Sequence, residues 1–146
     1  MRRLGIVAVG LALLVVTACG GASDPSADRR HEIAETIGGY TEALLNADAR
    51  SLQSYWSETC SEEWRRSIED AFASGPSPAR NDITVDEDAL EIEVRGSDLV
   101  AVLLNPHKVP LHLTVDGEPQ PGFFTAGPDV VHLLRREAGA WRIACK

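Results

Sequence analysis

The chain has 146 residues, of which 14 are Lys or Arg and 22 are Asp or Glu, and its formal net charge at pH 7 is −8. This length fits one domain of ordinary size. An acidic surface repels phosphate and offers no basic stripe for counterion release. The composition therefore predicts a single domain and excludes nucleic acid as an expected partner.

The first 18 residues have the organisation of an export signal. Arg2 and Arg3 form a basic start, and the apolar run 4–16 is shorter than the roughly 20 residues that span a bilayer. The sequence Val-Thr-Ala-Cys at 16–19 resembles the lipobox of bacterial lipoproteins. This resemblance implies a diacylglycerol, with chains such as palmitate, on the Cys19 sulfur and cleavage before that residue.

The mature chain is then expected to be held at the extracytoplasmic face of the cell membrane by its N-terminal lipid. Two or three acyl chains give stable anchoring, whereas one chain is marginal. The small and polar residues of 19–29 predict a flexible tether, and 30–146 is predicted to be the folded domain. Twelve arginines stand beside two lysines, a composition that resembles that of actinobacteria.

Two cysteines remain once Cys19 is assigned to lipid. In an oxidising compartment, Cys60 and Cys145 are expected to form a disulfide. Closing a loop of this length stabilises a domain by about 4 kcal/mol in chain-entropy estimates. Two buried free thiols are the alternative. A metal site is less favoured, because no histidine lies at ligand spacing from either cysteine.

The first half of the domain has helical periodicity. Apolar residues from His31 onward recur every three or four positions and predict an amphipathic helix, in which Gly38-Gly39 indicates close packing by another element. Asp48 is a candidate N-cap for a short second helix. A third helix, with Cys60 at its start, is expected to end before the Gly-Pro-Ser-Pro sequence of 75–78.

The second half alternates with a period of two. The runs 90–94 and 99–104 predict a hairpin around Gly96-Ser97, 111–115 predicts a further strand, and 130–134 with 141–145 predict a closing hairpin. The acidic group Asp82, Asp86, Glu87 and Asp88 lacks the spacing of a calcium loop and is interpreted as a solvated turn.

Three helices followed by an antiparallel meander give an α+β fold in which the helices pack on one face of a curved sheet. This order of elements, the Asn46-Ala47-Asp48-Ala49 turn and the closing 134–143 hairpin resemble the nuclear transport factor 2-like superfamily, also called cystatin-like, whose members are cone-shaped. The resemblance implies an apolar pocket between sheet and helices. It does not imply an activity, because members serve both as enzymes and as binding modules.

Five residues are candidates for such a pocket. His112 and His132 each lie mid-strand among apolar neighbours and could act as a base, although a solvent-facing position is the simpler interpretation. Tyr40, Tyr55 and Trp56 could contact a ligand, yet their helical spacing is also that of core residues. The sequence contains no serine-hydrolase elbow, zinc-protease motif or phosphate loop, so no cofactor, metal or catalytic residue is assigned.

These observations favour a non-catalytic domain that binds a small apolar ligand or an envelope protein at the cell surface. A small isomerase or dehydratase that uses His112 or His132 is the alternative. A third hypothesis is an accessory domain that forms a homodimer through the open face of its sheet.

Overall fold

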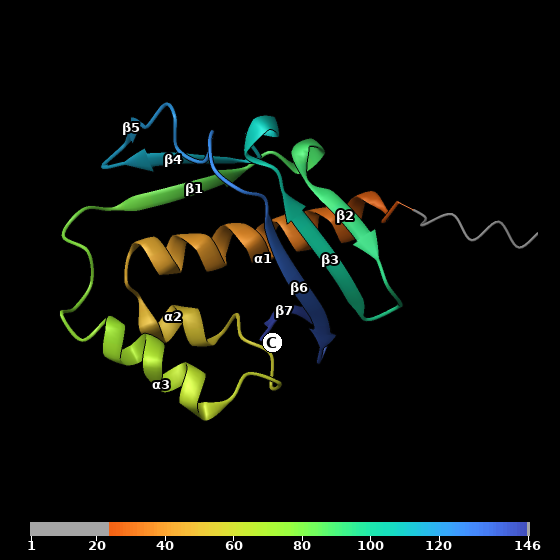
Figure 1. Cartoon of the computed structure of the whole chain (residues 1–146), viewed down its shortest axis with the longest axis horizontal. Helices are drawn as coiled ribbons and strands as arrows, with labels where there is room; N and C mark the ends of the chain where they lie inside the picture. The colour runs from red at the N-terminus through yellow and green to blue at the C-terminus, as the bar shows by residue number, and fades with distance from the viewer. Residues whose placement is uncertain (1–23, 146) are drawn as a thin grey trace, which may run out of the picture.

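The computed structural model describes residues 24–145 and consists of three helices followed by seven strands. The helices are α1 (Ala27–Leu45), α2 (Ala49–Gln53) and α3 (Glu62–Ala71). Figure 1 shows α1 running through the middle of the molecule, with α2 and α3 along one side of it. Among the described helices, none has both the length and the apolar character needed to cross a bilayer. Cys19 and the export signal lie outside the described residues.

Helix α1 begins earlier than the domain start predicted at residue 30. Ser26 is its N-cap and accepts a hydrogen bond from the Arg29 backbone N–H. The Arg29 guanidinium donates to the carbonyl oxygens of Gly96 and Ser97 at 3.1 and 3.0 Å. These long-range bonds hold the first turn of α1 against the β2–β3 turn, a contact that helical periodicity does not reveal.

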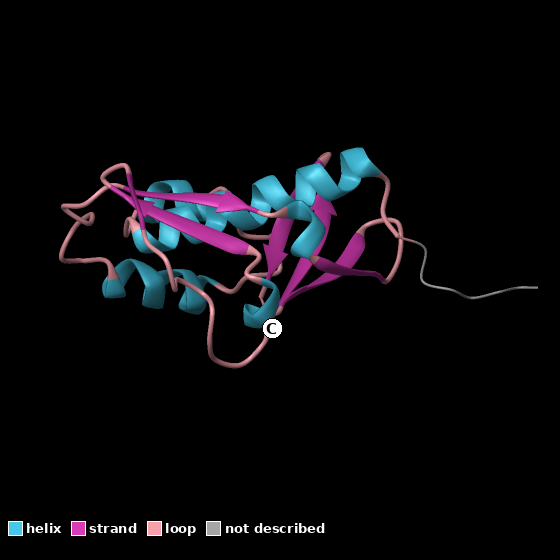
Figure 2. Cartoon of the chain, turned by 90° about the horizontal axis from the view of Figure 1, so that it is seen from above, coloured by secondary structure: helices cyan, strands magenta, loops and turns pink. Residues whose placement is uncertain are grey.

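The strands form two antiparallel sheets, which Figure 2 shows from above. One has the order β1-β4-β5 and the other β2-β3-β6-β7. The strand bounds are β1 Asn81–Val85, β2 Glu91–Val94, β3 Leu99–Leu104, β4 Leu111–Val115, β5 Glu118–Pro119, β6 Val130–Glu137 and β7 Ala140–Ala144. Both predicted hairpins, β2–β3 and β6–β7, are present with the expected turns.

Strand β1 corrects the interpretation of its acidic residues as one solvated turn. Asp82 lies within β1, which pairs with β4 along its whole length, and only 86–88 form a turn, at the 3-10 helix Glu87–Ala89. Two apolar residues, Ile83 and Val85, are too few to establish an alternating pattern. The strand is defined instead by its pairing with β4.

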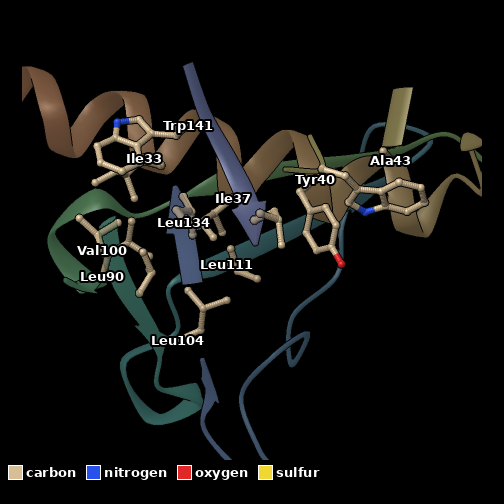
Figure 3. Close-up of a cluster of buried hydrophobic side chains, with 14 of the residues drawn as sticks. Ile33, Ile37, Tyr40, Ala43, Leu90, Val100, Leu104, Leu111, Leu134 and Trp141 are labelled. Atoms are coloured by element: carbon tan, nitrogen blue, oxygen red, sulfur yellow. The ribbon is translucent and has the colours of Figure 1, made fainter. Parts of the chain in front are cut away.

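The hydrophobic core lies between α1 and the four-stranded sheet. Figure 3 shows Ile33, Ile37 and Tyr40 in succession along α1 and Leu134 and Trp141 from the closing hairpin. The segment 120–129, which links β5 to β6, has turns but no strand. Its Phe123 and Phe124 rings pack against the core cluster from outside.

The glycine pair of α1 permits two close contacts, as the sequence predicted. A Cβ on Gly38 would lie 3.0 Å from a methyl group of Val85 in β1. A Cβ on Gly39 would lie 2.5 Å from the Tyr55 ring carbon that bears the hydroxyl. The missing side chains therefore allow β1 and Tyr55 to pack directly on the helix backbone.

Side chains of α1 and its C-cap cover the free edge of β1. The Asn46 amide donates to the Asn81 carbonyl at 2.8 Å and accepts from the Asn81 N–H at 2.9 Å. The Glu42 carboxylate accepts from the Ile83 N–H at 3.1 Å. Because an exposed strand edge can pair with another chain, these bonds protect β1 while they fix its position along α1.

A second junction joins the helical layer to the edge strand β7. Ile143 donates its N–H to the Tyr55 carbonyl at 2.7 Å and accepts from the Ser57 N–H at 2.9 Å. Close by, Cys60 and Cys145 form the expected disulfide, which confirms the pairing inferred from the sequence. The segment between α2 and α3 is thus attached to β7 by both backbone and covalent bonds.

Loss of this disulfide should lower the free energy of unfolding by about 4 kcal/mol, because it closes a loop in the unfolded chain between cysteines 85 residues apart. The Cys60→Ser, Cys145→Ser and double variants should all show the same loss in urea unfolding. Reductant should destabilise the wild type to that level and leave the double variant unchanged. Equal midpoints for the wild type and the double variant would contradict a stabilising role.

Candidate functional site

The side chains of Tyr40, which is buried, and His132, which is half-buried, meet at the edge of the hydrophobic core. Tyr40 belongs to the buried stripe of α1 and is 8% exposed. His132 lies in β6 on the face of Val130 and Leu134 and is paired in register with the buried Val102. The Tyr40 and His132 rings are in edge-to-face contact, with centroids 5.5 Å apart and planes inclined at 75°.

Burial favours the uncharged form of both side chains. Desolvation raises the pKa of the Tyr40 hydroxyl and lowers the pKa of the His132 imidazole, and no charged neighbour opposes either change. Among residues 24–145, no hydrogen bond is made by the Tyr40 hydroxyl or by the His132 ring nitrogens. The pair therefore presents one O–H donor and a neutral imidazole that can donate or accept.

The other three candidate pocket residues make no aromatic ring contact with this pair among the described residues. His112 is exposed on β4, where it pairs in register with Thr84. Trp56 is 4% exposed and stacks edge-to-face on Trp64 at 4.8 Å, as a core residue. Tyr55 packs over Gly39 of α1 and lines a surface cleft. The structure thus brings only Tyr40 and His132 together.

A surface cleft of about 770 Å³ lies between α1 and β1 and also borders the β6–β7 turn. Tyr55, Thr84 and Trp141 contribute to its walls. Four carboxylates also line it, and each has a partner: Glu32 pairs with Arg136, Glu35 and Glu87 pair with His31, and Glu42 binds the β1 backbone.

Sequence reasoning missed this cleft. A signal was available on α1, where Glu32, Glu35 and Glu42 share the face opposite the apolar stripe. Nothing in the sequence indicates that β1 lies beside that face. Within the described residues, no group of three or more His, Cys, Asp and Glu side chains is arranged to hold a metal ion.

The outer face of the four-stranded sheet carries an apolar strip on its two central strands. Val131 of β6 is 49% exposed, and its register partner on β3 is Leu103. The flanking strands are charged, with Glu91 and Glu93 on β2 and Arg142 on β7. The homodimer hypothesis concerns this surface, and it stays a prediction.

No family model and no curated protein matches the chain. Among solved structures it is similar to a protein of unknown function with a cystatin-like fold from Nostoc punctiforme, with a TM-score of 0.51 and 16% identity over 83% of this chain and 90% of that one. A nuclear transport factor 2-like protein of unknown function from Shewanella baltica has a TM-score of 0.48 and 13% identity, over 84% of this chain and 94% of that one.

The fold is cystatin-like, as predicted. It has three helices followed by antiparallel strands, the α+β order expected from the sequence. At these levels of identity the likeness establishes the architecture alone. The function must therefore be argued from the residues of this chain.

His132, which faces the core, and His31, which lies on the surface, should change the pH dependence of stability in opposite directions. His132 has a lowered pKa in the fold, so the unfolded chain binds more protons, and stability should fall as the pH drops through the ordinary value of 6.5. His31 has a pKa raised mainly by its hydrogen bond to Glu87, so its contribution is present below that value and lost as the pH rises through the folded pKa.

Urea unfolding between pH 5 and 8 measures both effects. The His132→Gln variant should lose the acid-side decrease that the wild type shows, whereas His31→Gln should make that decrease steeper. A wild-type slope that is retained in His132→Gln would contradict a buried, neutral imidazole.

Proposed function

We propose that this chain is an exported, lipid-anchored domain whose cone binds a small, largely apolar ligand without changing it chemically. The observation that carries the proposal is the Tyr40–His132 pair. Tyr40 is 8% exposed and its hydroxyl has no hydrogen-bond partner among residues 24–145. The Tyr40 hydroxyl is not among the buried polar atoms of the described residues that lack a partner, so solvent reaches it, and a ligand with one polar group could bond it in place of water.

The chemistry of the pair indicates which ligands it would take. The surrounding side chains, among them Ile37, Leu104 and Leu111, are apolar and fully or almost fully buried. A hydroxyl donor beside a neutral imidazole suits a ketone, ester or alcohol carried on a hydrocarbon body. An anionic ligand is disfavoured, because no charged group stands beside the pair to offset its desolvation.

The same features argue against a reaction. A general base works best when its pKa lies near the working pH and when a neighbour stabilises its charged form. The pKa of His132 is lowered by burial, and no carboxylate is among the groups that shift it. The imidazole can therefore position a polar group more readily than it can accept a proton.

Export and anchoring rest on the N-terminal sequence. The lipobox-like residues 16–19 support lipidation at Cys19, and the Cys60–Cys145 disulfide is of the kind formed in oxidising compartments. A tether of a few residues before α1 would keep the domain close to the membrane, where apolar compounds partition. This location and this class of ligand are mutually consistent.

Titration with 2-decanone and with decane tests the binding site, using the Cys19→Ser chain and NMR. The ketone should shift the signals of Tyr40 and His132, and Tyr40→Phe should weaken ketone binding about five- to tenfold, the loss of one hydrogen bond. The same substitution should leave decane binding unchanged. Tyr55→Phe is the matched control, because Tyr55 lies at the outer cleft.

The outcomes separate the hypotheses. Shifts confined to the α1–β1 cleft, or no binding of either compound, would reject a ligand site in the cone. Recovery of an altered ketone, with loss of the conversion in His132→Gln, would replace the binding function by the enzymatic alternative.

Lipidation is tested by intact mass on protein from bacterial membranes. The chain should lack residues 1–18 and carry the mass of acyl chains, and Cys19→Ser should remain unacylated and leave the membrane fraction. A chain that retains Met1 and has an unmodified Cys19 thiol would show that the anchor is absent.

A further inference from the structure

The segment 120–129 between β5 and β6 is attached to the domain in an unusual way. Its backbone and side-chain hydrogen bonds from Pro121 to Pro128 are internal: Phe123 N–H donates to Gln120 at 3.3 Å, and the Thr125 hydroxyl donates to Gly122 at 2.9 Å. Figure 2 shows the segment looping out beyond both sheets. Among the described residues, none outside it forms a hydrogen bond with 121–128.

Two aromatic rings make the contact with the body instead. Every residue from Glu118 to Asp129 is exposed except Phe123 and Phe124, which are partly buried. The two rings lie 6.4 Å apart and pack against the core cluster that contains Tyr40. At its far end the segment enters β6 at Val130, two residues before His132.

The backbone of the segment is held away from its preferred conformation. Phe124 has a φ of +52°, which is disfavoured for a residue with a Cβ. Gly122 and Gly127, with φ of +92° and +111°, flank it and adopt such angles without steric cost. Packing of the two rings on the core is therefore accompanied by backbone strain at Phe124. The two flanking glycines can adopt a wide range of backbone angles.

We propose that the segment 120–129 is a lid, and that Phe123 and Phe124 close the mouth of the cone and swing out to admit a ligand to Tyr40 and His132. This inference rests on the proposed function. Opening would expose two rings and break no hydrogen bond between 121–128 and the body, while the Gln120 N–H keeps its bond to the Leu113 carbonyl at 2.8 Å at the base of the segment. It therefore belongs to the class of local openings that occur without global unfolding.

The clefts along α1 and β1, beside the α1–α2 turn and at the β2–β3 turn are not lined by Tyr40 or His132. Water reaches the pair, because His132 is half-buried, whereas a larger ligand of the proposed class must displace part of the core covering. Residues 121–128 can move in this way, because two side chains and no hydrogen bond hold them to the body.

Native-state proteolysis tests the lid independently of any ligand. Chymotrypsin should cleave the Cys19→Ser chain after Phe123 or Phe124 at a rate that changes little with urea below the unfolding transition. Cleavage that instead follows global unfolding, with the full urea dependence, would overturn the lid. Cleavage that is insensitive to urea would support a mobile segment even if no ketone binds. In that case the proposed function alone would be rejected.

Binding kinetics test whether the lid controls entry. If opening limits association, the Phe123→Ala/Phe124→Ala variant should bind 2-decanone at least about tenfold faster than the wild type. Val131→Ala, which removes an exposed apolar side chain from the outer sheet face, is the matched control and should not differ from the wild type. Phe124→Gly, which removes the ring and relieves the positive φ, serves if the double variant unfolds. Unchanged association in both lid variants would contradict control of entry by the segment.

Discussion

The attachment of the helical layer to β7 is the constraint on which the rest of the structure depends. β7 is an edge strand, and its free backbone groups at Ile143 are bonded by Tyr55 and Ser57 instead of by water. The Cys60–Cys145 disulfide secures the same junction covalently. Together these bonds hold the segment between α2 and α3 against the sheet, with Trp56 buried beneath it. A small domain with a modest core gains much of its stability from such a cross-link.

Helix α1 is the second organising element, because packing surrounds it on several sides. Its apolar stripe faces the four-stranded sheet, and its glycine pair accepts Tyr55 at a distance that a Cβ on Gly39 would forbid and Val85 at a distance that a Cβ on Gly38 would crowd. The helix also supplies the groups that cover the edge of β1. The cost of two glycines in a helix, about 1 kcal/mol each relative to alanine, is offset by this close approach. The position of α1 in turn determines where Tyr40 enters the core.

The proposed function and the proposed lid depend on the same balance of polar and apolar groups. Tyr40 and His132 bring hydrogen-bonding capacity into an apolar environment where no described residue uses it. Phe123 and Phe124 pack on the core, and 121–128 makes no hydrogen bond to the body. The proposed ligand site depends on the first of these features, the free hydrogen-bonding capacity of the pair, and the proposed lid depends on the second. The surface carboxylates of the α1–β1 cleft, by contrast, are already engaged by neighbouring groups.

The sequence by itself determined the features that depend on local residue patterns or on the number of cysteines. The helix stripes, both hairpins, the close contact at Gly38-Gly39 and the Cys60–Cys145 pair follow from periodicity, turn residues and the assignment of Cys19 to lipid. Only the tertiary structure decided the strand β1, the early start of α1 and the meeting of Tyr40 with His132. The physical reason is that these features are created by partners distant in the chain. β1 exists through its bonds to β4, and which of two similar mid-strand histidines contacts α1 depends on which sheet face receives that helix.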